Sequence, residues 1–135
     1  MSQHPYIFEF PIKVRDYEVD GQGIVNNANY LHYLEHTRHE FCEYVGLTWR
    51  RMNEMGLMPV VRKVEIEYIN SLHMGETMVS KLWLERKGPR FIFHQDIFTT
   101  EGLHIVTANV TVVSVVNGRP SRGEVLAETF REYLD

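Results

Sequence analysis

The stretch from Asp20 to Arg38, DGQGIVNNANYLHYLEHTR, decides how the chain is divided into elements. Its first half contains two glycines and two asparagines, residue types that favour turns and helix N-caps. In its second half apolar residues begin to recur at helical spacing, and this pattern continues to Val45. The stretch therefore predicts a loop over residues 16–26 and a long helix that starts at Asn27 or Ala28.

The remainder of the chain alternates apolar and polar residues with a period of two, which is typical of strands. Pro11 in the first such run favours an edge position for that strand. The motifs KGPR at 87–90 and TEGL at 100–103 predict hairpins, so the last three strands should form an antiparallel meander. The expected strands span residues 6–14, 60–69, 77–86, 91–100 and 105–116, and short helices are expected over residues 48–56 and 121–134.

This order of elements indicates an α+β fold in which one long helix packs on one antiparallel sheet. At 135 residues the chain is long enough for one domain and too short for two, so a single domain over residues 1–135 is expected. One helix leaves much of the sheet uncovered. A second copy of the chain is a natural cover for the remaining face or edge, and we expect a homo-oligomer.

The amino-acid composition limits the classes of binding partner and the cellular compartments that are expected for the protein. With 14 Lys and Arg against 18 Asp and Glu, the net charge of -4 gives no drive toward nucleic acid. The N-terminal residues lack the basic and apolar regions of a signal peptide, and no apolar run is long enough to span a membrane. The single cysteine, Cys42, predicts a buried thiol rather than a disulfide. A soluble cytoplasmic protein is expected.

The loop and helix resemble the sequence motif of the hotdog-fold acyl-CoA thioesterases, and are most similar to the 4-hydroxybenzoyl-CoA thioesterase-like family. The resemblance covers almost the whole chain. It implies a hotdog fold, with a long central helix packed on a five-stranded antiparallel sheet, and hydrolysis of acyl-CoA by a homodimer or homotetramer without a cofactor or metal. The matching motif positions are Asp20, Gly23, Asn27, Tyr30, Glu35 and Arg38.

Thioester hydrolysis requires an activated nucleophile and stabilisation of negative charge on the acyl oxygen. The resemblance assigns the first task to Asp20, either as general base on water or as nucleophile. Backbone N–H groups of Asn27 and Ala28 at the helix start, where the helix dipole is positive, fit the second task. Gly23 lets the backbone approach a ligand closely. Asn26 stands where several bacterial relatives carry part of a Tyr-His or Trp-Tyr pair.

Further contacts are expected along the substrate. Tyr30 is a candidate for substrate binding, and Tyr30, Leu34 and Met58 are candidates for the apolar end of the site. Coenzyme A carries phosphates, so basic residues near loop ends are candidate contacts. Arg90 is the preferred one, because the resemblance places its turn near the coenzyme. The full set of basic candidates is Lys63, Lys87, Arg90, Arg119 and Arg122.

Other readings of the same residues remain open. Asp20 with its glycines can simply form an Asx-type turn that leads into the helix. Glu35 is an alternative catalytic carboxylate, although an ion pair with Arg38 or His39 is favoured for it. Histidines at helical spacing are able to bind zinc, but no further ligands complete a site, and a solvated polar face or an interface histidine cluster is favoured. These histidines are His32, His36 and His39.

Three functions remain after these comparisons. Acyl-CoA hydrolysis is the expected one. An acyl-ACP thioesterase is the nearest alternative, and a non-catalytic hotdog protein that binds acyl thioesters is the alternative from another class. Serine hydrolase, P-loop and dinucleotide-binding motifs are missing from the sequence.

Overall fold

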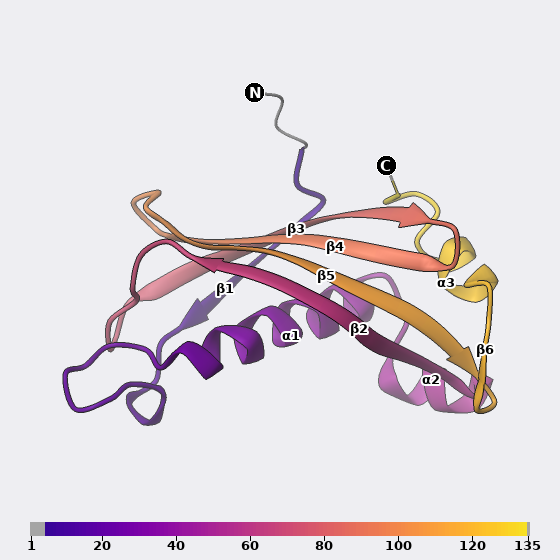
Figure 1. Cartoon of the computed structure of the whole chain (residues 1–135), viewed down its shortest axis with the longest axis horizontal. Coiled ribbons are helices and arrows are strands. Elements are labelled where there is room, and N and C mark those ends of the chain that lie inside the picture. The colour runs from indigo at the N-terminus through magenta and orange to yellow at the C-terminus, as the bar shows by residue number, and fades with distance from the viewer. Residues whose placement is uncertain (1–4, 135) are drawn as a thin grey trace.

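A long helix, α1 (Asn27–Tyr44), lies along one face of a curved antiparallel sheet (Figure 1). The computed structural model describes residues 5–134. The side chains that α1 buries against the sheet recur every three or four residues, which is the period of one helix face. They are Tyr30, Tyr33, Leu34, Thr37 and Phe41. The predicted helix is confirmed, and it ends one residue before Val45.

Five strands form the sheet in the order β1-β3-β4-β5-β2. The predicted combination of one long helix and a five-stranded antiparallel sheet is therefore confirmed, as is the meander of β3, β4 and β5. A two-residue strand, β6 (Arg119–Pro120), adds to the end of β5. The bounds of the strands are β1 Phe8–Lys13, β2 Leu57–Tyr68, β3 Thr77–Lys87, β4 Arg90–Thr99 and β5 His104–Val116.

The short helix α2 (Trp49–Met55) leads directly into β2. Thr48 caps its start by accepting the Arg51 N–H at 3.1 Å, and Gly56 ends it in the left-handed conformation at φ 63°. This sharp exit explains why β2 begins at Leu57, three residues earlier than the sequence predicts.

The C-terminal helix is shorter than expected. The prediction of a helix over residues 121–134 holds only for α3 (Glu124–Thr129), which begins after Gly123 in the left-handed conformation. Leu126 and Phe130 at this end are buried in the half of the core below the C-terminal part of α1. In the described part of the chain, no helix is both long and apolar enough to cross a membrane.

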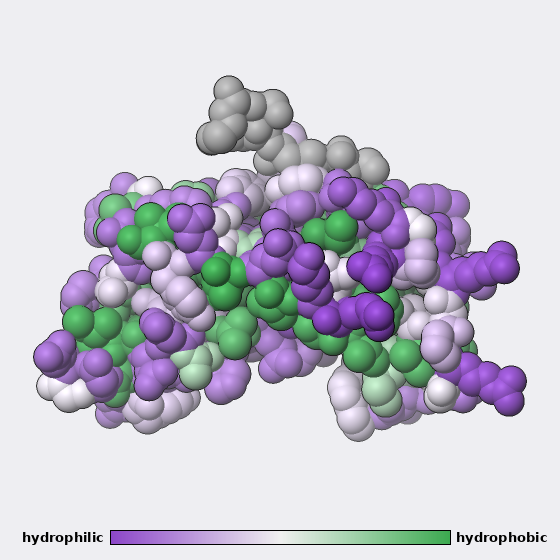
Figure 2. All heavy atoms as spheres, viewed as in Figure 1, coloured by the Kyte–Doolittle hydropathy of each residue, from purple (hydrophilic) through white to green (hydrophobic). Residues whose placement is uncertain are grey.

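The two edges of the sheet differ. β1 is six residues long and carries Pro11, a residue that blunts edge pairing. β2 is twelve residues long, and it exposes Val61, Val64 and Tyr68 by 44%, 40% and 44%. Figure 2 shows hydrophobic residues in a band across the face on which β2 lies in Figure 1. The β2 edge is thus long, carries both apolar and charged exposed side chains, and is uncovered by residues 5–134 of the same chain.

Candidate active site

The loop before α1 is built around the carboxylate of Asp20. Its Oδ1 accepts the N–H groups of Gln22 at 2.8 Å and Ile24 at 3.2 Å, so the Asx-type turn is present. The Gly23 N–H donates to the Asp20 carbonyl at 3.0 Å, and Gly23 has φ 77°, which favours glycine. Asp20 is exposed, and its Oδ2 has no hydrogen bond to residues 5–134. One oxygen holds the turn while the other is available for chemistry.

Glu18 anchors this loop from behind, a role that the sequence does not predict. It is 5% exposed and accepts hydrogen bonds from the Arg15 backbone (2.8 Å), the Arg15 guanidinium (2.7 Å) and the Tyr33 hydroxyl (3.0 Å). Burial raises the pKa of Glu18, but the hydrogen bonds and charge of Arg15, with the Tyr33 bond, outweigh it and hold the pKa below its usual value. The buried carboxylate links the loop to α1.

Backbone pairing fixes the loop to the sheet as well. The Val25 N–H donates to the Leu72 carbonyl at 2.9 Å, and the Met74 N–H donates to the Gly23 carbonyl at 2.9 Å. The Tyr30 hydroxyl on α1 accepts the Leu72 N–H at 3.0 Å. Asp20 is therefore carried on a loop that is tied to both the helix and the segment before β3.

The helix start offers one free donor rather than the two that the sequence suggests. Asn26 caps the helix, because its Oδ1 accepts the Ala28 N–H at 3.0 Å. This corrects the prediction of a free Ala28 N–H. The Asn27 N–H has no acceptor in the described chain. The positive end of the helix dipole and the Asn27 N–H together make this position suited to a partially negative oxygen.

A small pocket of about 90 Å³ lies next to this donor. Tyr30 forms part of its wall, although the side chain is only 2% exposed and also belongs to the core. The pocket is lined by Asn27, Tyr30, Tyr68, Ile69, Asn70 and Ser71. A carbonyl group is small enough to enter it beside the Asn27 N–H.

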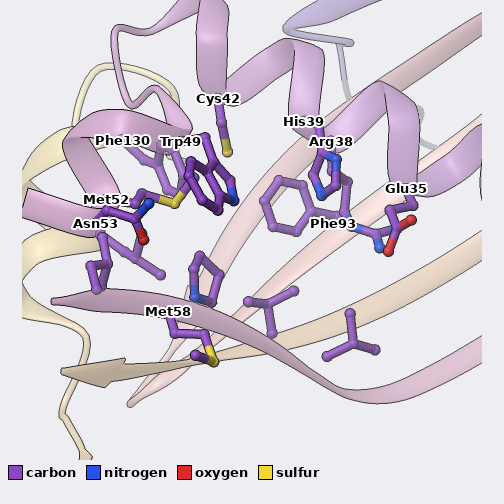
Figure 3. Close-up of a pocket in the computed structure, with 15 residues that line it drawn as sticks. Glu35, Arg38, His39, Cys42, Trp49, Met52, Asn53, Met58, Phe93 and Phe130 are labelled. Carbon is purple, nitrogen blue, oxygen red and sulfur yellow. The ribbon is translucent and has the colours of Figure 1, made fainter. Parts of the chain in front are cut away.

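A larger pocket of about 340 Å³ lies near the other end of α1, between α1, α2 and the start of β2 (Figure 3). Figure 3 shows Trp49 and Met52 on one side and Glu35 and Arg38 on the other. Met58, a candidate for the apolar end of the site, lines this pocket, whereas the candidate Leu34 is fully buried in the core and lines neither pocket. The two pockets lie along the same helix.

Arg90 and Asp20 lie far apart within one chain. The Asp20 loop pairs with the segment before β3, whereas Arg90 begins β4 at the far end of the β3–β4 hairpin. A ten-residue strand spans roughly 30 Å, which separates the two positions. Lys87, Arg119 and Arg122 lie at this same far end. Four of the five basic candidates therefore share one end of the molecule, and Lys63 lies on β2.

The other sequence candidates on α1 do not assemble a second site. Glu35 forms no ion pair with Arg38 or His39 in residues 5–134, so the expected pairing is wrong. His36 lies 3.9 Å from Glu40. No group of three side chains of the metal-ligating type is found among the described residues. Burial raises the pKa of Cys42 to about 11, which opposes a role as thiolate nucleophile.

Comparison with known proteins identifies the family. A sequence model of the thioesterase-like superfamily matches residues 14–130. The chain belongs to this superfamily. It is 31% identical to the acyl-CoA thioesterase YbgC of Haemophilus influenzae over 118 residues, which cover 83% of each protein. It is 34% identical to the acyl-acyl carrier protein thioesterase ATL2 of Arabidopsis thaliana over 117 residues, 84% of the chain.

The chain spans only 62% of ATL2 and 38% of the related Arabidopsis protein ATL3. Among solved structures, a hypothetical protein from Aquifex aeolicus has a TM-score of 0.82 and 32% identity, with 90% of this chain and 98% of that one covered. A DHNA-CoA thioesterase from Staphylococcus aureus shares the fold, with a TM-score of 0.81, 21% identity and coverage of 93% and 86%. This protein therefore has the hotdog fold that its loop and helix motif implies.

Proposed function

We propose that the protein is an acyl-CoA thioesterase that hydrolyses an acyl-CoA thioester to a free acid and CoA. The observation that carries the proposal is that one anchored loop before a helix holds Asp20, which has a carboxylate oxygen without a hydrogen bond, and leads to Asn27, whose N–H has no acceptor in the described chain. Membership of the thioesterase-like superfamily supports it. The two groups match the two requirements of thioester cleavage.

Asp20 can act in either of two ways. As general base, its Oδ2 takes a proton from water while the water oxygen bonds to the acyl carbon. The C–S bond then breaks, and the departing CoA thiolate takes that proton from Asp20, which restores the carboxylate. As nucleophile, Oδ2 bonds to the acyl carbon and expels the thiolate, and water then hydrolyses the mixed anhydride. In both routes negative charge develops on the acyl oxygen, where the Asn27 N–H and the helix dipole stabilise it.

Gly23 and Asn26 shape the substrate side of this loop in the proposed site. Apart from Gly23 and the residues on either side of it in sequence, no atom lies within 4 Å of the position that a Cβ on Gly23 would occupy. A substrate can therefore approach the backbone there. Asn26 holds the helix start through its bond to Ala28, which leaves the Asn27 N–H as the exposed donor. Tyr30 completes the wall beside that donor.

We also propose that the active form is a homo-oligomer built on the β2 edge. The uncovered strand of twelve residues with exposed valines supports this proposal, because a second β2 running antiparallel would supply both backbone hydrogen bonds and apolar contacts. In such a pair centred on Val64, Lys63 of each copy would face Glu65 of the other, so the charges are complementary. Arg90 remains the preferred contact for coenzyme A phosphate, and a cytoplasmic location is part of the same proposal.

Replacement of Asp20 by asparagine tests the function. Asparagine keeps the Oδ1 acceptor for Gln22 and Ile24, so the thermal midpoint should stay within about 2 °C, whereas kcat should fall by about 10² to 10⁴. Asp16→Asn is the matched control, because Asp16 is exposed nearby in a short 3-10 helix. Thiol release from a panel of short, long and aromatic acyl-CoAs measures turnover. Wild-type turnover rates of the Asp20→Asn variant at saturating substrate would refute the proposal.

An acyl-ACP thioesterase is the second candidate, favoured by the match to ATL2. Hydrolysis of one acyl group presented on CoA and on acyl carrier protein separates the two functions by their kcat/KM. A protein that binds both carriers without releasing thiol would instead be a non-catalytic acyl-thioester-binding protein.

A further inference from the structure

The larger pocket has the size and lining of a small-molecule site. Its volume of about 340 Å³ lies within the range of roughly 300–1,000 Å³ that is typical of such sites. Its apolar lining includes Phe93 and Phe130, and Trp49 and Met52 lie together with Phe130 on one side (Figure 3). The side chains are large and mostly apolar, so the pocket suits a compact organic group rather than water alone.

Four polar residues, Glu35, Arg38, His39 and Asn53, interrupt this apolar lining, and Arg38 has a buried hydrogen-bond acceptor. One of its terminal nitrogens donates to the Gln95 Oε1 at 3.0 Å. Gln95 is fully buried, and its own Nε2 donates to the Leu34 carbonyl at 3.0 Å, so the acceptor for Arg38 is fixed in place. A guanidinium carries five N–H donors. The bond to Gln95 leaves the other donors of Arg38 without an acceptor among residues 5–134.

Arg38 also lacks an ion pair in direct contact among residues 5–134. Burial lowers the pKa of Arg38, and the charge of Glu35 opposes this only in part. No carboxylate in the described chain lies within ion-pair distance of the guanidinium, and Glu35, which also lines the pocket, is exposed. A charge withdrawn from water is stabilised by a hydrogen-bonded counter-charge. A carboxylate accepts two parallel N–H bonds from arginine and meets this need.

We propose, on the basis of the thioesterase function above, that this pocket holds the acyl group and that Arg38 binds a carboxylate at the end of that group remote from the thioester. The substrate class is then the monothioester of a compact dicarboxylic acid. Trp49, Met52 and Phe93 contact the hydrocarbon part of the acyl group. The carboxylate lies against Arg38, on the side of the pocket opposite Trp49 and Met52.

The position of the pocket relative to the helix start agrees with a compact substrate only in the oligomer. Within one chain, eleven residues of α1 separate Asn27 from Arg38, which is about 16 Å and needs an extended acyl chain of about 14 bonds. Antiparallel pairing of two β2 strands changes this. Tyr68 lines the small pocket and Met58 lines the large one, so the Tyr68 end of one strand would meet the Met58 end of the other. The helix start of one copy then adjoins the large pocket of its partner.

Binding of uncharged and charged probes tests this without turnover. The probes are N-(2-acetamidoethyl) amides of adipic acid, of adipic acid monoamide and of hexanoic acid, in which an amide replaces the thioester. Trp49 fluorescence reports occupancy of the pocket in a Trp83→Phe background, which leaves Trp49 as the single tryptophan of the chain. The adipic acid probe ends in a carboxylate, the monoamide probe in a carboxamide and the hexanoic acid probe in a methyl group. The carboxylate probe should bind about 10-fold to 100-fold more tightly than the methyl probe, and the affinity of the carboxamide probe should lie between them.

Arg38→Met should remove this preference while the methyl probe still binds, and Arg38→Lys, which keeps the charge without the planar fork, should reduce it. Arg51→Met on the exposed side of α2 is the control and should retain it. Equal binding of the carboxylate and methyl probes, or an unchanged preference in Arg38→Met, would overturn the proposal. The outcome is independent of Asp20: a failure of the thioesterase proposal shows as turnover by Asp20→Asn, whereas a failure here shows as loss of selectivity in binding.

Discussion

Replacement of Glu18 by alanine should destabilise the protein through the loop that carries Asp20. The Tyr33 hydroxyl would lose its acceptor, and because Tyr33 is 1% exposed, an unsatisfied buried hydroxyl costs about 1–3 kcal/mol. The Arg15 N–H would lose a further bond worth about 1 kcal/mol. The Arg15 guanidinium is 54% exposed and regains water, so its ion pair adds less than about 1 kcal/mol.

The expected loss in the free energy of unfolding is therefore about 3 kcal/mol, which lowers the thermal midpoint by about 10 °C for a chain of this length. Urea unfolding at pH 7, followed by circular dichroism, measures it. Tyr33→Phe removes the stranded hydroxyl, so the double variant should lose about 1–2 kcal/mol less than the two single variants combined. A loss below about 0.5 kcal/mol in Glu18→Ala, or strict additivity in the cycle, would refute the reasoning.

Three further predictions concern stability and assembly. The folded-state pKa of Glu18 lies below its unfolded value of about 4.3, so its stabilisation is present above that pH and is lost as the pH falls through the folded pKa; urea midpoints between pH 5 and 3 should fall more steeply for the unmodified protein than for Glu18→Gln. Gly123→Ala should cost about 2–4 kcal/mol in thermal unfolding, because Gly123 has φ 85° and a Cβ there would lie 2.6 Å from the buried ring of Phe91. Gly88→Ala is the control: Gly88 has φ 60° with open space around it, so this variant should cost only the backbone strain of about 1 kcal/mol. Val64→Lys should shift the mass measured by light scattering from oligomer to monomer, and Leu103→Lys in the β4–β5 turn should leave it unchanged.

The elements could be predicted from sequence where one local rule decides them. Thr48 and Gly56 bound α2 as expected, because a capping hydroxyl and a left-handed glycine act over three or four residues. The end of α3 could not be predicted in this way. Apolar residues continue to Leu134, but they pack on the core beyond the helix, and Leu134 pairs with Leu84 instead of extending it. Tertiary contacts decide that segment.

The candidate site shows the same division. Asp20 and Gly23 could be located from the motif, because loop and helix follow each other in sequence. The capping of Ala28 by Asn26 depends on one rotamer, and the burial of Glu18 depends on Tyr33 fifteen residues later. Asn26 also offers a reason for the departure from the bulkier pair of bacterial relatives: an asparagine at this position caps the helix through its own side chain.

Arg38 illustrates why charge in a sequence does not reveal its environment. By spacing alone it belongs to an ion pair with Glu35 three residues earlier, which is the usual arrangement on a solvated helix face. In the fold its guanidinium turns toward Gln95 on β4, 57 residues away, and faces a cavity instead. In the proposed site, α1 carries a free N–H at Asn27 and, eleven residues later, the guanidinium of Arg38, which has no contact ion pair in the described chain. A two-fold axis through the paired β2 strands would place the Asn27 end of α1 in one copy beside the Arg38 pocket of the other copy. Pairing of two copies is therefore the arrangement that would bring the Asn27 N–H and the Arg38 guanidinium together.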